Sequence, residues 1–416
     1  MRRAYAIFIW HGFFLALTTA MLDLNTVFPA LVASLVDSKA VFGLLYSIML
    51  GVPFVFNIVF GHYLQDKPRK KPYLLLGIYL RTAAFLGMAI FTLLWAREHP
   101  LLLLLSLFGW VFLFSLSGGF ASLAYADIMG KMVPKGPRGR LYATKQFASS
   151  LALLLGGLLV ARLLALDGLP YPSNYAILLT IGGLGLFVAA LAFWFIPEEK
   201  EEPWVEEKES LGQFIRKVPE IVRRDRAFLR FILAANLSSV SLMLLPFYIL
   251  FAQDTFHLGP EWVGRFLVFQ TLGVILSNLV WGLLSHRGGS RVVVRVCILT
   301  GGIIPLVALL LPALGPGAFG LVFVLVGFVM SGRKVGFEPY LLDLAPEDRR
   351  SIYVGINGTL NFSRVLLPAL SGFLIDAMGF PVTFGMTVVV MALAYLLLGA
   401  PKEPAIPSGV TRNGQA

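Results

Sequence analysis

Twelve long apolar segments dominate the sequence. They are centred near residues 15, 52, 84, 113, 154, 185, 241, 272, 302, 328, 364 and 390. Each has about 20 residues, the length that a helix needs to cross the ~30 Å hydrocarbon core of a bilayer. They are apolar on all sides and lack the alternation of a membrane β-strand, so only helices satisfy their backbone polar groups in lipid. The sequence therefore predicts an all-α integral membrane protein with twelve transmembrane helices.

The composition also excludes a soluble surface, because 57% of the residues are hydrophobic and only 14% are charged. The net charge of +11 would suit a nucleic-acid-binding protein. However, most loop Lys and Arg residues fall on one side of the predicted spans, and the other side holds only Lys39 and Arg97. This asymmetry predicts a cytoplasmic (inner) membrane protein with both termini in the cytoplasm, and it explains the basicity without nucleic acid. The single cysteine, Cys297, excludes an intrachain disulfide, and no residue pattern suggests a metal or another cofactor.

One charged segment divides the chain. We expect an N-terminal six-helix bundle over residues 1–196, a cytoplasmic linker over 197–227, a C-terminal six-helix bundle over 228–400 and a cytoplasmic tail over 401–416. Within the linker, apolar residues from Leu211 to Val222 recur at helical spacing, with basic residues on the other faces. This pattern is typical of a helix that lies on the anionic inner leaflet.

The two predicted bundles resemble each other in sequence. NIVFG at Asn57–Gly61 matches NLVWG at Asn278–Gly282 with an offset of 221 residues, and the same offset relates Gly43 to Gly264. Further along, RGRLY from Arg138 corresponds to RRSIY from Arg349. A duplicated six-helix unit explains these matches, and such repeats place a substrate site near the midplane between the halves.

Two loops resemble the G-x-L-x-D-R-x-G-x-R motif of the major facilitator superfamily. GLLSHRGGSR from Gly282 is the closer copy, whereas GHYLQDKPRKK from Gly61 carries its acidic residue one position late. The resemblance covers nearly the whole chain and implies a secondary transporter with a cytoplasmic gate. The alternative is that these basic loops serve only as topogenic signals. The gate residues that the resemblance implies are Gly61, Asp66, Arg69, Asp127, Arg138, Gly282, Arg287, Arg291, Asp343 and Arg349.

Polar residues inside the spans are candidates for substrate binding or ion coupling, because charge in lipid is costly. Asp23 belongs to a stripe at helical spacing formed by Gly12, Ala16, Thr19, Asp23, Thr26 and Ala30. We expect it on the cavity side of helix 1, and the alternative is an interfacial residue at the outer mouth. His11 is either a proton carrier or a packing residue, and Arg81 is expected to snorkel or to pair with a neighbouring helix.

Helices 10 and 11 suggest the charge of the solute. In helix 10, Arg333 and Lys334 lie deep, and Glu338 follows Lys334 at a spacing that permits pairing. Unless helix 10 ends early, these groups face the cavity. In helix 11, one polar face carries Asn357, Asn361 and Arg364, and its symmetry mate in helix 5 carries Gln146. The excess of cations suggests an organic anion, unless Arg364 pairs with Asp376 and serves packing alone.

The sequence lacks the motifs of several other classes. It contains no G-x-x-x-x-G-K-[ST] phosphate loop, no G-x-S-x-G and no H-E-x-x-H, so ATP hydrolysis and the commonest hydrolytic chemistries are not expected. We therefore predict a transporter and not an enzyme, whose partners are a small solute, the lipid bilayer and a coupled proton. Multidrug or metabolite efflux by proton antiport is an alternative, although helix 5 lacks the GP-x-x-GG pattern of drug antiporters. A non-transporting membrane sensor or enzyme with this fold is a second alternative.

Overall fold

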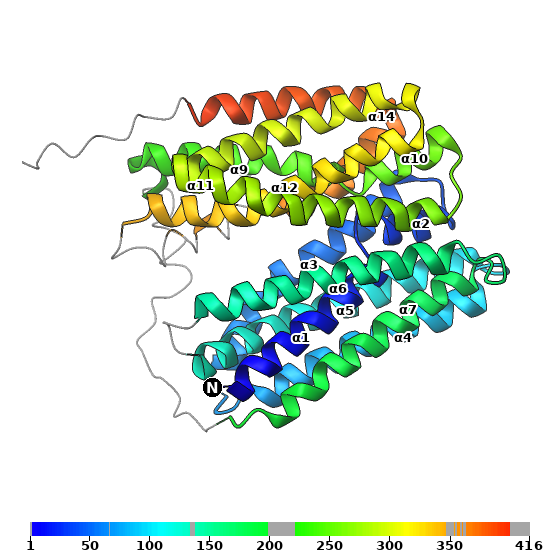
Figure 1. Ribbon diagram of the computed structural model, residues 1–416, viewed down its shortest axis with the longest axis horizontal. Coiled ribbons are helices and arrows are strands. Elements are labelled where there is room, and N and C mark those ends of the chain that lie inside the picture. Colours follow the sequence, from blue (N-terminus) through cyan, green and yellow to red (C-terminus); the bar gives the residue numbers. More distant parts are fainter. Residues whose placement is uncertain are drawn as a thin grey trace, which may run out of the picture.

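The computed structural model describes residues 2–65, 67–133, 138–198, 221–346, 353, 356–357, 360 and 363–399. The amphipathic helix that the sequence predicts in the linker falls almost entirely outside these residues. We call the end of the molecule at which the N-terminus lies the inner end, and the opposite end the outer end (Figure 1).

The first half of the chain forms one bundle, drawn from blue to green in Figure 1. Prolines at the first or second positions of two of its helices fit there, because the first turn needs no donor from them. Its helices are α1 (Arg2–Met21), α2 (Val27–Ala33), α3 (Lys39–Gln65), α4 (Lys71–Trp95), α5 (Pro100–Met132), α6 (Arg138–Leu164) and α7 (Ser173–Leu191), with a short continuation η1 (Ala192–Phe195).

The second half forms a similar bundle beside it, drawn from green to red (Figure 1). Its helices are α9 (Arg226–Leu244), α10 (Phe247–Phe256), α11 (Glu261–Leu310), η2 (Leu311–Leu314), α12 (Pro316–Leu344) and α14 (Ser363–Leu397).

Two of these helices each contain a sharp turn. Gly289 has φ 72° and ψ 178° inside α11, and Gly379 has φ 79° and ψ 167° inside α14. Glycine takes these angles without steric cost, so the chain reverses there. Ten helical stretches in the described residues are long and apolar enough to span a membrane. Because α11 and α14 each hold two spans, the described residues account for the twelve predicted helices.

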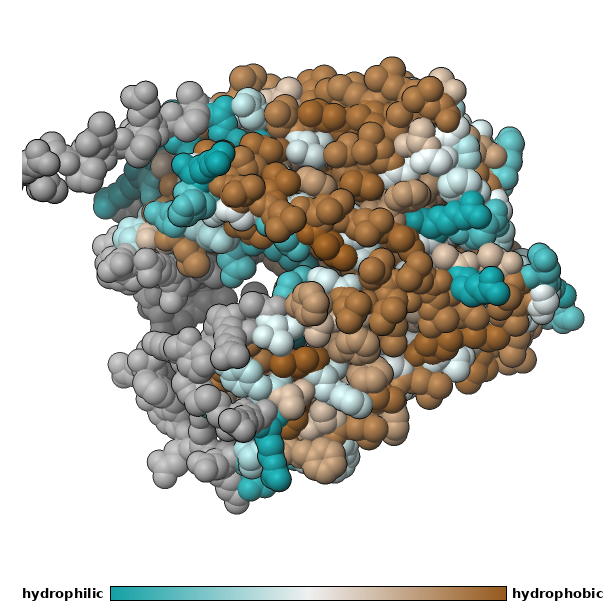
Figure 2. Space-filling view, in the orientation of Figure 1, coloured by the Kyte–Doolittle hydropathy of each residue, from teal (hydrophilic) through white to brown (hydrophobic). Residues whose placement is uncertain are grey.

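The predicted repeat is visible in the packing of the two bundles. Asn57 of α3 lies against Gly119 of α5, and its sequence mate Asn278 of α11 accepts a hydrogen bond of 2.7 Å from Ser331 of α12. Each asparagine therefore faces the corresponding helix of its own bundle. The outward faces carry exposed leucine, valine and phenylalanine side chains, which form the broad hydrophobic surface in Figure 2. Such a surface is stable only in lipid.

Candidate functional site

Glycines set the contact between the two bundles. At Gly43 of α3, a Cβ atom would collide with the carbonyl oxygen of Pro368 in α14. At Gly264 of α11, it would collide with the backbone of Ala161 in α6. Gly43 and Gly264 are the pair that the sequence repeat relates, so the same small residue permits close backbone approach on both sides of the pseudo-twofold axis. Both contacts lie in the outer halves of their helices.

Asp376 strengthens this outer contact. Its carboxylate, on α14, accepts hydrogen bonds from the Ser38 hydroxyl at 2.8 Å and from the backbone N–H groups of Lys39 and Ala40 at 2.9 Å each. It therefore caps the N-terminus of α3 from the opposite bundle, where the helix dipole favours negative charge. Lys39 also pairs with Asp254 of α10 at 3.0 Å. The outer ends of the two halves are thus joined by apolar, hydrogen-bonded and ionic contacts.

The inner ends are arranged differently. In the described residues, the polar contacts at this end stay within one bundle. The Ser290 hydroxyl donates to Asp343, and the backbone N–H groups of Lys70 and Lys71 donate to Glu198 at 2.6 and 2.7 Å. Figure 2 shows a hollow between the bundles at the inner end. As far as the described residues show, the conformation is therefore closed on the outer side and open on the inner side.

Asp23 lies at the outer contact, in the turn between α1 and α2. Its carboxylate accepts from the backbone N–H of Asn25 at 3.0 Å and from the Thr26 hydroxyl at 2.9 Å. The side-chain amide of Gln270, on α11 of the other half, donates to it at 3.1 Å. Asp23 is only 8% exposed. It is therefore a buried carboxylate that links the two halves directly.

The turn at Asp23 differs from the continuous helical stripe that the sequence suggests. Helix α1 ends at Met21 and α2 begins at Val27. The carboxylate bonds to groups two and three residues ahead of it, and such local bonds compete with helical ones. Asp23 nevertheless faces inward, between the two bundles.

Comparison with known proteins settles the family. The family model of the Major Facilitator Superfamily matches residues 10–363 and, in a second match, 241–415. The chain belongs to the major facilitator superfamily. Together with the two six-helix bundles, this membership confirms the predicted fold class and the prediction of a transporter rather than an enzyme. No curated protein sequence matches the chain.

Solved structures of superfamily transporters share the fold over almost the whole chain. A POT family transporter in complex with 5-aminolevulinic acid has a TM-score of 0.73 at 12% identity, with 95% of each chain covered. The nucleoside transporter NupG has a TM-score of 0.69 at 13% identity, covering 96% of this chain and all of that one. A bacterial homologue of the iron transporter ferroportin, in an inward-facing state, has a TM-score of 0.72 at 15% identity, covering 96% and 98%.

Among the gate residues whose side chains the structure describes, none contacts the opposite half in this conformation. No atom of the described residues lies within 4 Å of the position that a Cβ would take at Gly61 or Gly282. Asp127 pairs with Lys131 on its own helix at 2.6 Å, and Arg291 donates to the carbonyl of Leu398. Arg69 and Arg287 are exposed, whereas Asp66, Arg349 and the side chain of Arg138 lie outside the described residues. The latch remains a prediction for a conformation closed on the inner side.

The substrate candidates of the C-terminal half are only partly brought together. Helix α12 continues through Pro339 to Leu344, so helix 10 does not end early. Arg333 is buried, donates to the carbonyl and hydroxyl of Ser238 at 3.1 Å each, and lies 4.2 Å from the Phe337 ring centroid. Lys334, Glu338 and Gln146 are exposed, and no ion pair joins Lys334 to Glu338 in the described part of α12. Asn357 is half-buried, and the side chains of Asn361 and Arg364 lie outside the described residues.

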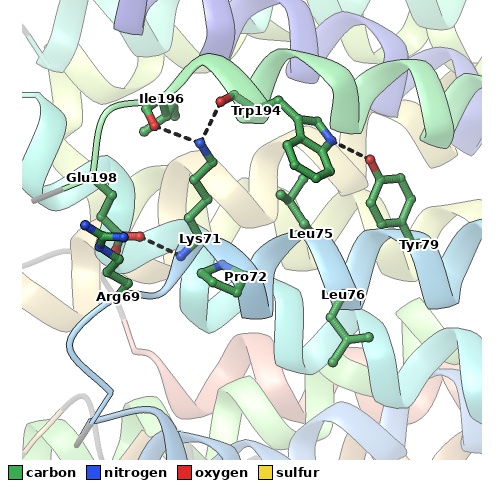
Figure 3. Close-up of a pocket in the computed structure, with 9 residues that line it drawn as sticks. All are labelled: Arg69, Lys71, Pro72, Leu75, Leu76, Tyr79, Trp194, Ile196 and Glu198. Atoms are coloured by element: carbon green, nitrogen blue, oxygen red, sulfur yellow. Dashed lines mark hydrogen bonds between the residues drawn. The ribbon is translucent and has the colours of Figure 1, made fainter. Parts of the chain in front are cut away.

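Glu198 has a role that the sequence did not reveal. Glu198 lines a groove of about 560 Å³. The groove lies between α4 and the end of α7, where Glu198 is close to Lys71 and Arg69 (Figure 3). The Lys71 ammonium donates to the carbonyls of Trp194 and Ile196 at 2.6 and 3.0 Å. Glu198 thereby caps the N-terminus of α4, and Lys71 binds the carbonyl groups at the C-terminal end of the first bundle. The acidic linker that follows in sequence hid this role, because Glu198 looked like one more of its charges.

Lys145 was missed for another reason. It lies on α6, and its ammonium is 2.7 Å from the Tyr125 hydroxyl of α5. A single lysine near the start of a helix gives no pattern in the sequence that would relate it to a partner on another helix. Gln270, the partner of Asp23 in this facilitator, was missed as well, because a single amide in an apolar helix gives no pattern.

Proposed function

We propose that this chain is a secondary transporter that moves a small solute across the membrane by alternating access. The observation that supports this most strongly is the asymmetry of the contact between the halves. The glycine contacts at Gly43 and Gly264 and the Asp376 cap all lie at the outer end, and the hollow lies at the inner end (Figure 2). Two bundles joined at one end and separated at the other have the arrangement that rocking about a central site requires.

We further propose that a proton is the coupling ion and that Asp23 carries it. In the closed outer gate, Asp23 accepts three hydrogen bonds, one of them from Gln270 of the opposite half. Opening the outer side must separate the turn between α1 and α2 from α11 and break the bond to Gln270. A carboxylate that loses a donor in this way holds a proton more readily. Protonation of Asp23 would therefore favour outer opening.

The predicted location is part of this proposal. The described structure is that of a multi-pass membrane protein. The positive-inside pattern supports placement in the cytoplasmic membrane with both termini inside. A reporter enzyme that works only in the cytoplasm should be active when it is fused to either terminus of the full chain. A reporter that works only in the periplasm should be inactive at both termini, and its activity would contradict this topology.

Transport is tested with the purified full-length chain. A panel of solutes is screened for a rise in melting temperature, since a ligand that binds only the folded state stabilises it. Each hit is then tested for counterflow in proteoliposomes. We expect at least one hit to exchange across the membrane without ATP. Failure of every stabilising solute to exchange would contradict the transporter proposal.

Coupling is tested with Asp23→Asn, which keeps the shape of the side chain and removes its charge. We expect this variant to retain solute exchange but to lose pH-driven accumulation. Asp37→Asn is the matched control, because Asp37 is an exposed carboxylate just beyond α2. Unchanged accumulation by the Asp23 variant would show that another group couples the proton.

A further inference from the structure

Four polar side chains from four helices lie near one another inside the N-terminal bundle. They are His11 of α1, Arg81 of α4, Tyr125 of α5 and Lys145 of α6. Arg81 lies ten residues after the start of α4, about 15 Å along its axis, and Lys145 lies about 10 Å along α6. Both cations are within membrane-spanning segments. The His11 and Tyr125 ring centroids lie 5.3 Å apart, and the Lys145 ammonium lies 2.7 Å from the Tyr125 hydroxyl. Arg81 packs against Gly118, about two helical turns from Tyr125 on the same helix, so the four side chains share one region of the bundle.

Arg81 has no hydrogen-bond acceptor among the described residues. Its guanidinium lies 4.2 Å from the ring centroid of Phe114 and packs against Gly118, and its Nε is buried without a partner. A guanidinium carries five N–H donors. A contact with an aromatic face compensates only part of their lost hydration at this depth. The arrangement therefore leaves donors for an acceptor that these residues do not supply.

Lys145 reaches across α1 to join this cluster. A Cβ at Gly12 would collide with the Lys145 side chain. Because Gly12 has no side chain, there is room for the Lys145 side chain to extend from α6 to α5. The Lys145 ammonium lies 2.7 Å from the Tyr125 hydroxyl and 4.7 Å from the centroid of its ring. No carboxylate among the described residues forms an ion pair with it. The Nδ1 atom of His11, which is 6% exposed, also lacks a partner there.

The sequences of the surrounding helices show why these charges are not neutralised. Helices α1, α3, α4, α6 and α7 contain no Asp or Glu. Helix α5 contains one, Asp127, which pairs with Lys131. Asp23 follows α1 but bonds at the outer gate. Two cations within spans of such low acidic content imply negative charge from another source.

We propose that Arg81 and Lys145, with the Tyr125 hydroxyl, bind the carboxylate or phosphate group of an organic anion. Arginine offers a planar fork for two oxygens, and lysine adds a point charge that the tyrosine hydroxyl orients. The inference rests on the proposed transport function and names the class of its solute. It places the site in the N-terminal half, whereas the sequence pattern suggested the C-terminal wall around Arg364. The small residues Gly12 and Gly118 leave the room that the two long cationic side chains occupy.

The test compares anions with neutral analogues of the same shape. The melting temperature of the purified chain is measured at constant ionic strength with acetate, benzoate, succinate and glycerol 3-phosphate, and with acetamide, benzamide, succinamide and glycerol. We expect at least one anion to stabilise the protein and its neutral partner to have no effect. Comparison of the rise in melting temperature with the carboxylates and with glycerol 3-phosphate shows whether the site prefers a carboxylate or a phosphate group. Stabilisation by the neutral members instead, or by no anion, would overturn the proposal.

Variants locate the site. Lys145→Gln and Arg81→Gln are each expected to raise the half-saturating concentration of the stabilising anion by about tenfold or more, as loss of a charge-assisted bond requires. Arg162→Gln, which removes an exposed cation from the outer end of α6, should bind like the parent. Equal binding by all three variants would overturn the assignment.

The melting temperature without ligand separates binding from a structural role. If Arg81 and Lys145 serve to bind a ligand, their replacement by glutamine removes charge that the ligand-free protein does not neutralise. The ligand-free variants should then melt at the same temperature as the parent or at a higher one. A lower melting temperature in both variants, together with unchanged anion affinity, would show that the cluster is structural. If counterflow succeeds only with an uncharged solute, the anion inference fails while the transporter proposal stands.

Discussion

Gly264 allows α11 and α6 to meet at the outer gate, and its replacement by alanine tests how that gate closes. The added Cβ would overlap the backbone of Ala161, and backbone cannot rotate aside as a side chain can. Overpacking of this kind costs about 1 to 3 kcal/mol. The cost falls only on the conformation in which the outer ends touch. Alanine also has a higher helix propensity than glycine, but that gain applies to both conformations and cancels.

A bias of about 1 to 3 kcal/mol changes a conformational equilibrium by roughly 5- to 150-fold. Gly264→Ala should therefore raise the outward-open population by that factor. Ser47, buried at the outer contact where its hydroxyl accepts from the N–H of Ala369 at 3.0 Å, provides the reporter. Its replacement by cysteine, in a background without Cys297, gives a thiol that a membrane-impermeant maleimide reaches only when the outer side opens.

The labelling rate is proportional to the open population while that population is small. We expect Gly264→Ala to speed labelling of the Ser47→Cys thiol several-fold or more, and its repeat mate Gly43→Ala to do the same. Gly109→Ala is the control, because nothing lies within 4 Å of a Cβ at that position. Labelling at the parent rate in both gate variants would refute the view that glycine-mediated contact holds the outer side closed.

Three further predictions concern residues at both ends of the molecule. Gly282→Leu should impair counterflow while expression stays intact, since it blocks helix approach when the inner side closes, and normal rates would remove the latch assignment. Arg364→Lys should weaken binding of an anionic solute through loss of the planar fork, and Arg364→Gln should weaken it further; unchanged transport by both would exclude a role in binding. Asp376→Ala should lose about 0.5 to 2 kcal/mol of capping energy and speed labelling at Ser47, whereas a parental rate would show that the cap does not hold the gate.

The fold could be predicted because lipid leaves few alternatives. Apolar runs of about 20 residues in water-free surroundings must be helical, so the number of spans followed from the sequence. The repeat was equally accessible, since Gly43 and Gly264 are required by the same close contact in the two halves. The turn at Asp23 was not predictable from periodicity, because Thr26 and Ala30 continue the helical spacing beyond it.

The site was harder to predict because it depends on which helices meet. Arg81 and Lys145 are separated by 64 positions in the sequence and belong to different helices, so no local pattern relates them. Arg333 looked like an unpaired cation, but the structure places Ser238 of α9 within hydrogen-bonding distance. A polar stripe on one helix shows that a partner exists and leaves its identity open.

The central claim, alternating access between the two bundles, is tested most directly by paired distances at opposite ends of the molecule. Spin labels at Pro68 and His286 report the inner ends, and labels at Asp167 and His257 report the outer ends, in a background without Cys297. All four positions are exposed. Addition of a transported solute and an inward proton gradient should shorten the inner distance and lengthen the outer one together. If one distance changes without the other, or if neither responds, the two halves do not rock about a central site and alternating access is refuted.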